Sequence, residues 1–451
     1  MSTAHQQRDA VTTVPLLRYG LIALPLAFAG LPLYMHAPAF YAQYYGVSLA
    51  ALAVALLFLR VIDAFQDPVI GWLGDRYAAH RPAVIAAALV VLSGGMLMLF
   101  HPYPGFELLW FCTAMIITAT AFSVLVVHVN ALGGLWTADP YEKTKITTVR
   151  EGFILAGILL AAVLPVLLEN VTDAKNALPL FAVLTAVLTM LCGIVFWTWL
   201  SRQDFATAPP REKMRLSALW RIVTAERIRG FFLVYFISAL ASAFPLVLFL
   251  FFVSDYLEAQ EWTGAFLAVY FLSGIAAMPF WLYLSRRSGK IFAWGAAMLL
   301  AVAAFIWVAT LQAGDTLCFA AVCFASGLAL GAGMSLPPSI LSDIIDAENN
   351  RDYATGQFSA LAFLSKLALA VAGAAGLFGI ESAGYDVSRS FQNSDAARAL
   401  LVYYGIIPCG IQLVALGGVV LWYKKHGKGI YATQNFDGNK NTHHYGGSHV
   451  S

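Results

Sequence analysis

The feature that most limits the fold of this chain is a succession of long apolar segments. About twelve of them lie between residues 19 and 423, and each approaches the roughly 20 apolar residues that cross a bilayer core as a helix. Hydrophobic residues make up 60% of the sequence and charged residues 12%, with a mean hydropathy of +0.73. Soluble domains contain about 25% charged residues. The sequence therefore predicts an all-α polytopic membrane protein with twelve transmembrane helices.

The positions of the Lys and Arg residues predict how the chain crosses the membrane. If the N-terminus is cytoplasmic, all but five of the 27 fall in segments on the cytoplasmic side, as the positive-inside rule requires. The five exceptions are Arg60, Lys175, Lys366, Arg389 and Arg398. We therefore expect an integral protein of the plasma (inner) membrane with both termini in the cytoplasm. The first apolar run is too long for a signal peptide, so we expect it to remain as a helix.

A long polar interruption divides the chain into two halves. Residues 201–230 contain Pro209-Pro210 and seven Lys or Arg, and they fall between the sixth and seventh apolar segments. We predict an N-terminal six-helix bundle at 1–200, a cytoplasmic linker at 201–230, a C-terminal six-helix bundle at 231–423 and a disordered cytoplasmic tail at 424–451. Carriers built from paired halves bind their substrate between the halves near mid-membrane.

Charged residues inside the second apolar segment are the strongest functional signal. Arg60, Asp63 and Asp67 occupy one short stretch of it, although a charge at the bilayer centre costs about 2.5–3.5 kcal/mol on insertion scales. Asp63 and Asp67 share a face, because residues four apart are neighbours on a helix. Two carboxylates that face one cavity suit a monovalent cation or a transported proton. A structural salt bridge with Arg60 or Lys366 is the alternative.

A second motif follows the same segment. Residues 71–81 read Gly-x-x-x-Asp-Arg and end in a basic pair, which resembles the signature of the major facilitator superfamily. The resemblance implies that the Gly permits close helix packing and that Asp and Arg form a cytoplasmic latch. A basic loop at 286–290, six helices on, supports an internal repeat, with the positive-inside rule as its alternative. The residues to which we assign gating roles are Gly71, Asp75, Arg76, Arg81, Arg150, Arg286 and Arg287.

Polar side chains in the first, second, fourth, seventh and eleventh predicted helices are candidates to line a central cavity. Our candidates for solute contact are Tyr34, His36, Arg60, His128, Asn130, Ser238 and Lys366. For His36 and His128 the alternative is packing with one internal hydrogen bond. For Arg60 and Lys366 the alternative is a static ion pair.

The second helix also carries a more specific resemblance. Arg60-x-x-Asp63-Ala-x-x-Asp67-Pro-x-x-Gly71 resembles the helix-two motif of the glycoside–pentoside–hexuronide:cation symporters, the melibiose carrier family. Shorter stretches as far as Ser365-Lys366 resemble the same family in the same order. The resemblance implies the major facilitator fold and a coupling ion, Na⁺ or H⁺. It assigns the cation site to Asp63, Gln66, Asp67 and Ser123, with Lys366 linking the cation and solute sites.

The chain departs from that family at the acids that bind sugar hydroxyls. The helix-one carboxylate falls near Ala27 and the helix-four carboxylate near Val126, and neither residue has a polar side chain. A site that pairs sugar hydroxyls needs acceptors, because unpaired buried polar groups are costly. These losses argue against a galactoside and point to an anionic or less hydroxylated solute.

We therefore expect a secondary active transporter that moves a small organic solute, sugar-like, glycoside-like or anionic, by cation symport and alternating access. A lysolipid transporter and a proton-antiport exporter of amphipathic compounds are the alternatives. We find no nucleophile–base pair, metal cluster or nucleotide loop in the sequence, so we expect no enzymatic activity, no metal and no cofactor besides the coupling ion. We expect a monomer in the bilayer that does not bind nucleic acid.

Overall fold

The computed structural model describes residues 11–31, 33, 36–169, 171–203, 216–385 and 394–427. Within these ranges, helices are the only regular secondary structure. In the first half of the chain they are α1 (Thr13–Gly20), α2 (Ala23–Leu31), α3 (Ala37–Tyr45), α4 (Leu49–Arg76), α5 (Arg81–Phe100), α6 (Glu107–Leu135), α7 (Pro140–Glu169) and α8 (Ala174–Leu200). In the second half they are α9 (Leu216–Thr224), α10 (Glu226–Phe251), α11 (Thr263–Ser288), α12 (Lys290–Val308), α13 (Thr316–Ala347), α14 (Ala354–Ser382), α15 (Ser394–Leu401) and α16 (Ile407–Trp422).

Eleven helical segments of the described chain are long and apolar enough to cross a membrane. α4 is not among these eleven, yet its 28 residues span about 42 Å at 1.5 Å per residue. It packs between α6 and α14, and its carboxylates Asp63, Asp67 and Asp75 are buried against other helices. With α4 the count is the twelve transmembrane helices that the sequence predicts.

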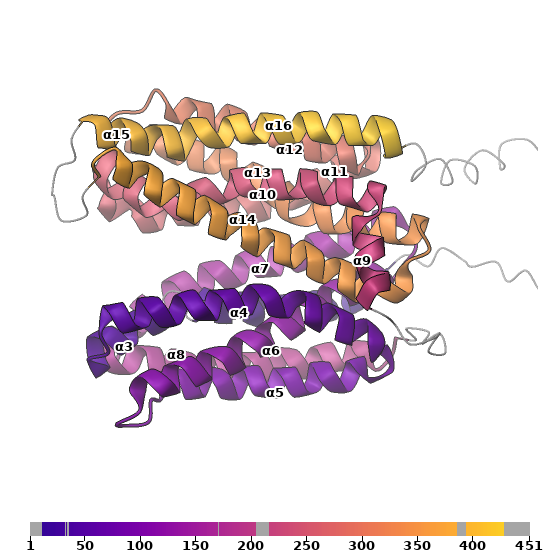
Figure 1. Ribbon diagram of the computed structural model, residues 1–451, viewed down its shortest axis with the longest axis horizontal. Helices are drawn as coiled ribbons and strands as arrows, with labels where there is room; N and C mark the ends of the chain where they lie inside the picture. The colour runs from indigo at the N-terminus through magenta and orange to yellow at the C-terminus, as the bar shows by residue number, and fades with distance from the viewer. Residues whose placement is uncertain are drawn as a thin grey trace, which may run out of the picture.

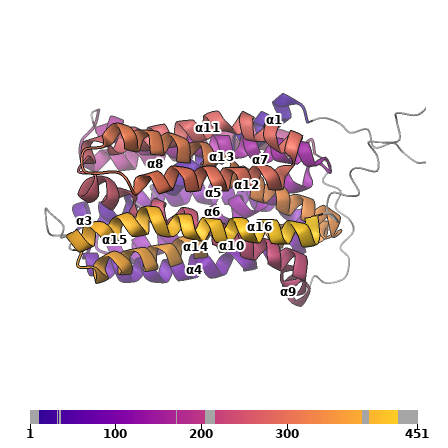
Figure 2. The same cartoon turned by 90° about the horizontal axis from the view of Figure 1, so that it is seen from above.

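The axes of the long helices are roughly aligned, and the helices form two groups. Figure 1 shows the first half of the chain, coloured indigo to magenta, below the second half, coloured pink to yellow. Figures 1 and 2 place α3 and α15 at one end of the molecule and α9 at the other. We refer to these as the α15 end and the α9 end.

The two halves meet where α4, α6 and α7 pack against α11, α13 and α14. Small residues let the backbones approach, as they do in many membrane proteins. A Cβ atom added to Gly71 of α4 would lie 2.9 Å from the Cα of Gly356 on α14 and would overlap the Ser359 hydroxyl. The predicted role of Gly71 in close helix packing therefore has a physical basis at the α4–α14 seam.

Several boundaries differ from those predicted. α7 begins at Pro140, twelve residues before the apolar run that starts at Gly152, because the Asp139 carboxylate accepts hydrogen bonds from the backbone N–H groups of Tyr141 and Glu142. An Asp cap followed by Pro is a strong start for a helix.

The linker and the tail also differ from the prediction. Residues 216–224 of the linker form the amphipathic helix α9, and α10 begins at Glu226. Residues 423–427 continue as a helical turn rather than a disordered tail. The rest of the predicted tail and residues 204–215 lie outside the described residues.

Close packing of α11 on α13 gives a test of the fold. We expect Gly327→Ala to lower the melting temperature, because the new Cβ would overlap the backbone oxygen of Tyr270, and overpacking costs about 1–3 kcal/mol. Gly333→Ala is the matched control on the same helix, since no atom lies within 4 Å of its added Cβ. Equal melting temperatures for the two variants would contradict this packing.

Candidate functional site

The centre of the candidate site is an ion cluster that joins the two halves. Lys366 of α14 places its Nζ 3.0 Å from Asp63 Oδ1, 2.9 Å from Asp67 Oδ2 and 3.0 Å from Ser123 Oγ. Asp67 is fully buried, and Asp63 and Ser123 nearly so. The structure thus brings together four of the residues that the sequence singled out, with the ammonium between the two carboxylates.

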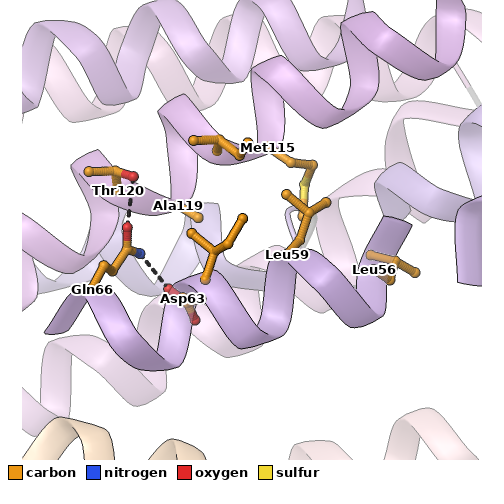
Figure 3. A pocket seen from close by; sticks show the side chains of 9 residues that line it. Leu56, Leu59, Asp63, Gln66, Met115, Ala119 and Thr120 are labelled. Atoms are coloured by element: carbon orange, nitrogen blue, oxygen red, sulfur yellow. Dashed lines mark hydrogen bonds between the residues drawn. The ribbon is translucent and has the colours of Figure 1, made fainter. Parts of the chain in front are cut away.

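A short chain of hydrogen bonds orients the Asp63 carboxylate from the side of α6. Gln66 donates from Nε2 to Asp63 Oδ1 at 2.8 Å, and its Oε1 accepts from the Thr120 hydroxyl at 2.8 Å, as Figure 3 shows. Ser123 lies one turn further along α6, with its Oγ 3.3 Å from Asp63 Oδ1. Thr120 was not predicted, because a single Thr in an apolar helix carries no signal of its own.

The pocket in Figure 3 lies between α4 and α6, beside Asp63. Apart from Asp63, Gln66 and Thr120, its walls are apolar side chains such as Leu59 and Met115. Its cavity volume is about 20 Å³, which is room for a single water molecule. This pocket is therefore too small to hold an organic solute.

A second set of contacts joins the halves at the α9 end. The Asp75 carboxylate accepts hydrogen bonds from the backbone N–H groups of Thr355 (2.8 Å) and Gly356 (2.7 Å), at the N-terminus of α14, where a helix attracts negative charge. Arg81 donates to the Thr355 hydroxyl at 3.0 Å and lies 4.0 Å from Asp75. Asp75 and Arg81, two predicted gating residues, therefore meet at one contact.

The α9 end also contains an ion cluster whose residues the sequence analysis did not assign to the site. Lys143 of α7 places its Nζ 2.6 Å from Asp346 and 3.6 Å from Asp343, both on α13. Lys290 reaches Asp343 at 2.6 Å. Lys143, Asp343 and Lys290 are almost completely buried. We call Lys143, Lys290, Asp343 and Asp346 the α9-end ion cluster.

The other predicted gating residues lie apart from these contacts. Arg76 stacks on the rings of Trp72 and Tyr77. Arg286 lies over the Tyr141 ring at 4.7 Å, which is a contact between the halves. Arg287 donates to the hydroxyl of its neighbour Tyr283 at 3.0 Å and stays exposed.

Arg150 requires a correction, because it lies inside α7 rather than in a cytoplasmic segment. It is 2% exposed and pairs with Glu151, which is 5% exposed. Glu151 was missed as well, since the apolar segment of this region begins one residue after it, at Gly152.

Among the residues whose side chains the structure describes, the solute candidates other than Lys366 do not gather at one place. His36 is half-buried at the start of α3, toward the α15 end. His128 contacts the Val124 carbonyl at 2.8 Å and packs near Gly74, and Asn130 is half-buried on the same helix. Ser238 accepts from the Gln412 amide at 3.2 Å inside the second half. Tyr34 and the Arg60 side chain lie outside the described residues.

Comparisons with known proteins agree on the family. A model of the family described as MFS/sugar transport protein matches residues 18–424. The inner membrane symporter YicJ of Escherichia coli (strain K12) is 27% identical over 82% of this chain and 82% of its own length. The sodium-dependent lysophosphatidylcholine symporter 1 of Gallus gallus is 23% identical over 91% of this chain and 86% of its own length.

The fold is that of a solved carrier. The crystal structure of FucP, a Major Facilitator Superfamily (MFS) transporter, in the outward conformation aligns with a TM-score of 0.66 at 14% identity. The alignment covers 91% of this chain and 97% of that chain.

The α9-end ion cluster gives a test of closure. We expect Asp343→Asn to open this end, because Lys143 and Lys290 then lose their shared counter-charge, and a buried pair that loses one partner is destabilised by about 3–5 kcal/mol. The measurement is the maleimide labelling rate of Ser339→Cys, at a fully buried position, in a background without the native cysteines. Labelling should become more than about tenfold faster, which corresponds to 1.4 kcal/mol.

The matched control is Glu348→Gln, which removes a partly exposed ion pair with Arg227 inside the second half. It should leave the labelling rate of Ser339→Cys unchanged. Equal rates in Asp343→Asn and in the parent protein would mean that the cluster does not hold this end closed.

Proposed function

We propose that this chain, which belongs to the MFS/sugar transport protein family, is a secondary active transporter that couples a small organic solute to a monovalent cation, Na⁺ or H⁺. The observation that carries this proposal is the position of the Lys366 ammonium between two buried carboxylates of the other half. A charge in lipid is costly, so three charged groups at one place favour a role in an ion pathway.

The depth of the cluster supports a transport site. Asp67 lies nine residues from the α9 end of α4, and Lys366 lies twelve residues into α14. At 1.5 Å per residue both are about 14–18 Å from that end, close to the middle of a bilayer core about 30 Å thick. Carriers of paired halves place their coupling-ion sites there, at the interface of the halves.

The mechanism follows from competition for the same oxygen atoms. The ammonium of Lys366 contacts Asp63, Asp67 and Ser123, which are the ligands that the family resemblance assigns to the coupling cation. The ammonium therefore stands where the cation would lie. A cation or proton that neutralises the carboxylates releases Lys366 toward the space between the halves, where the solute binds. Cation and solute then favour each other's binding by the same factor.

The contacts at the α9 end support alternating access. The Asp75 contact and the α9-end ion cluster close this end, and they break when the halves rock to release the solute. The distribution of Lys and Arg supports a cytoplasmic α9 end and an inner-membrane location. The closed end is then the cytoplasmic one, which suits uptake of a solute from outside.

A lysolipid carrier is the second candidate. The observation that favours it is the match to the Gallus gallus symporter, which extends over 91% of this chain. Stabilisation by lysophosphatidylcholine, without any response to sugars, would select this candidate.

The carboxylates give the direct test of coupling. We expect the melting temperature of the purified protein to rise with NaCl relative to choline chloride if Na⁺ couples, or to respond to pH in choline chloride if H⁺ couples. A ligand at 100 times its dissociation constant adds about 2.7 kcal/mol. Asp67→Asn and Asp63→Asn should each lose the response, because both carboxylates bind the cation.

Glu261→Gln is the control, since this carboxylate is exposed in a short turn before α11. It should respond as the wild-type protein does. The coupling role of the cluster is wrong if both Asp variants keep the full wild-type response.

A further inference from the structure

The linker helix α9 is amphipathic, and its apolar face packs on the second half of the chain. Leu219 is 6% exposed, and Ile222 and Val223 pack against a core cluster formed mainly by the second half. These residues are three and four apart, so they share one face of the helix. The apolar face therefore fixes α9 to the protein, although the helix lies outside the two bundles of long helices.

The rest of the α9 surface presents a tryptophan and a guanidinium. Trp220 is 70% exposed, more than any other tryptophan that the structure describes. Arg221 is exposed as well and pairs with no carboxylate among the described residues. The acid closest to it in sequence, Glu226, is already paired with Lys425. An apolar ring and an uncompensated positive charge therefore lie side by side on the outer face of α9.

The position of α9 places this face at the boundary of the membrane. Figure 1 shows α9 lying across the direction of the long helices, and Figure 2 shows it projecting sideways beyond α4 and α14. The membrane-spanning helix α10 begins two residues after α9 ends. A helix that lies across the ends of the spanning helices, and beside them, lies in the plane of the lipid headgroups.

The chemistry of the outer face matches an anionic phospholipid. Tryptophan is enriched at membrane–water interfaces, where its ring sits at the headgroup level. A guanidinium binds phosphate oxygen atoms with two parallel hydrogen bonds. Arg76, which follows Asp75 at the same end, is a second exposed guanidinium. A headgroup with a net negative charge compensates these cations, whereas a zwitterionic headgroup brings a cation of its own.

The buried face of α9 touches the contact that closes this end. Gly356 of α14 lies between Leu219 and Asp75, because a Cβ added to Gly356 would be 2.6 Å from a Leu219 methyl carbon and 3.0 Å from Asp75 Oδ2. The Gly356 N–H donates to the same Oδ2 at 2.7 Å. A ligand that holds α9 in place therefore holds Leu219 over the Asp75 contact.

We propose that α9 is a docking site for anionic phospholipid, with Trp220 in the headgroup layer and Arg221 on the lipid phosphate, and that bound lipid favours the closed α9 end. Lipid and closure then support each other by the same factor. Lipid binding does not depend on the proposed transport function, because it is measured without solute and without coupling cation.

The test of lipid binding uses the full-length protein in vesicles of phosphatidylcholine mixed with phosphatidylglycerol, with one lipid or the other brominated on its acyl chains. The difference in quenching between the wild type and Trp220→Phe reports the lipid around Trp220. We expect brominated phosphatidylglycerol to quench Trp220 more than brominated phosphatidylcholine at the same fraction. Arg221→Gln should lower this preference about fivefold, the factor for about 1 kcal/mol per basic residue near an anionic surface.

Arg202→Gln is the matched control, since it removes an exposed guanidinium that follows α8 at the same end, in the first half. It should leave the preference at the wild-type value. High salt should weaken the preference in the wild type, because it screens exposed charges. The proposal is overturned if the two lipids quench Trp220 equally, if Arg221→Gln keeps the full preference, or if neither lipid quenches, which would mean that a protein rather than lipid covers α9.

The link to closure is tested with the maleimide labelling rate of Ser339→Cys in the background without native cysteines. We expect slower labelling in vesicles that contain phosphatidylglycerol than in phosphatidylcholine alone. Leu219→Ala should keep the lipid preference of Trp220 but lose this effect on labelling, because the shortened side chain no longer reaches Gly356. Equal labelling in the two kinds of vesicle, or an undiminished lipid effect in Leu219→Ala, would contradict the link between lipid and closure.

Discussion

The pairing of Lys366 with two carboxylates across the boundary between the halves is the interaction on which the rest of the structure depends. A charge in lipid is stable only when another charge or a polar cavity compensates it. Asp63 and Asp67 lie one turn apart on α4, and the compensating ammonium comes from α14. The α4–α14 seam therefore has to form for either helix to remain in the membrane, and any ion that replaces the ammonium changes that seam.

The same helix connects the ion cluster to closure of the α9 end. The N-terminal N–H groups of α14 bind Asp75, and Lys366 lies about 15–17 Å further along the helix at 1.5 Å per residue. On α4, Gly71 lies between Asp75 and Asp67, and its contact with Gly356 and Ser359 of α14 brings the two backbones together. α4 and α14 thus touch at the latch, at the glycine contact and at the ion cluster. In the proposed mechanism, neutralising the carboxylates loosens one of these contacts on the α4–α14 seam, and ion binding is thereby coupled to the closed end.

The sequence predicted the fold and the family, because apolar length, basic loops and the helix-two motif are local patterns. The family match over residues 18–424 confirms that part. From the sequence, the pairing of Lys366 with Asp63 and Asp67 is one of several alternatives, because only the fold shows which helices meet. Glu151 and the role of Lys143 escaped prediction for a physical reason: an Asp139 cap extends α7 through charged residues, and hydropathy places such residues in loops. The site assignments themselves stay predictions.

The most direct measurement compares the cation response of the wild-type protein with that of Lys366→Met, with Lys366→Arg as the charge-retaining control. Melting temperature is followed against NaCl at fixed pH and against pH in choline chloride. If the ammonium competes with the coupling cation for Asp63 and Asp67, Lys366→Met should need at least about tenfold less cation for the same stabilisation, a difference of about 1.4 kcal/mol. An equal or higher requirement in Lys366→Met would contradict occupation of the cation site by Lys366.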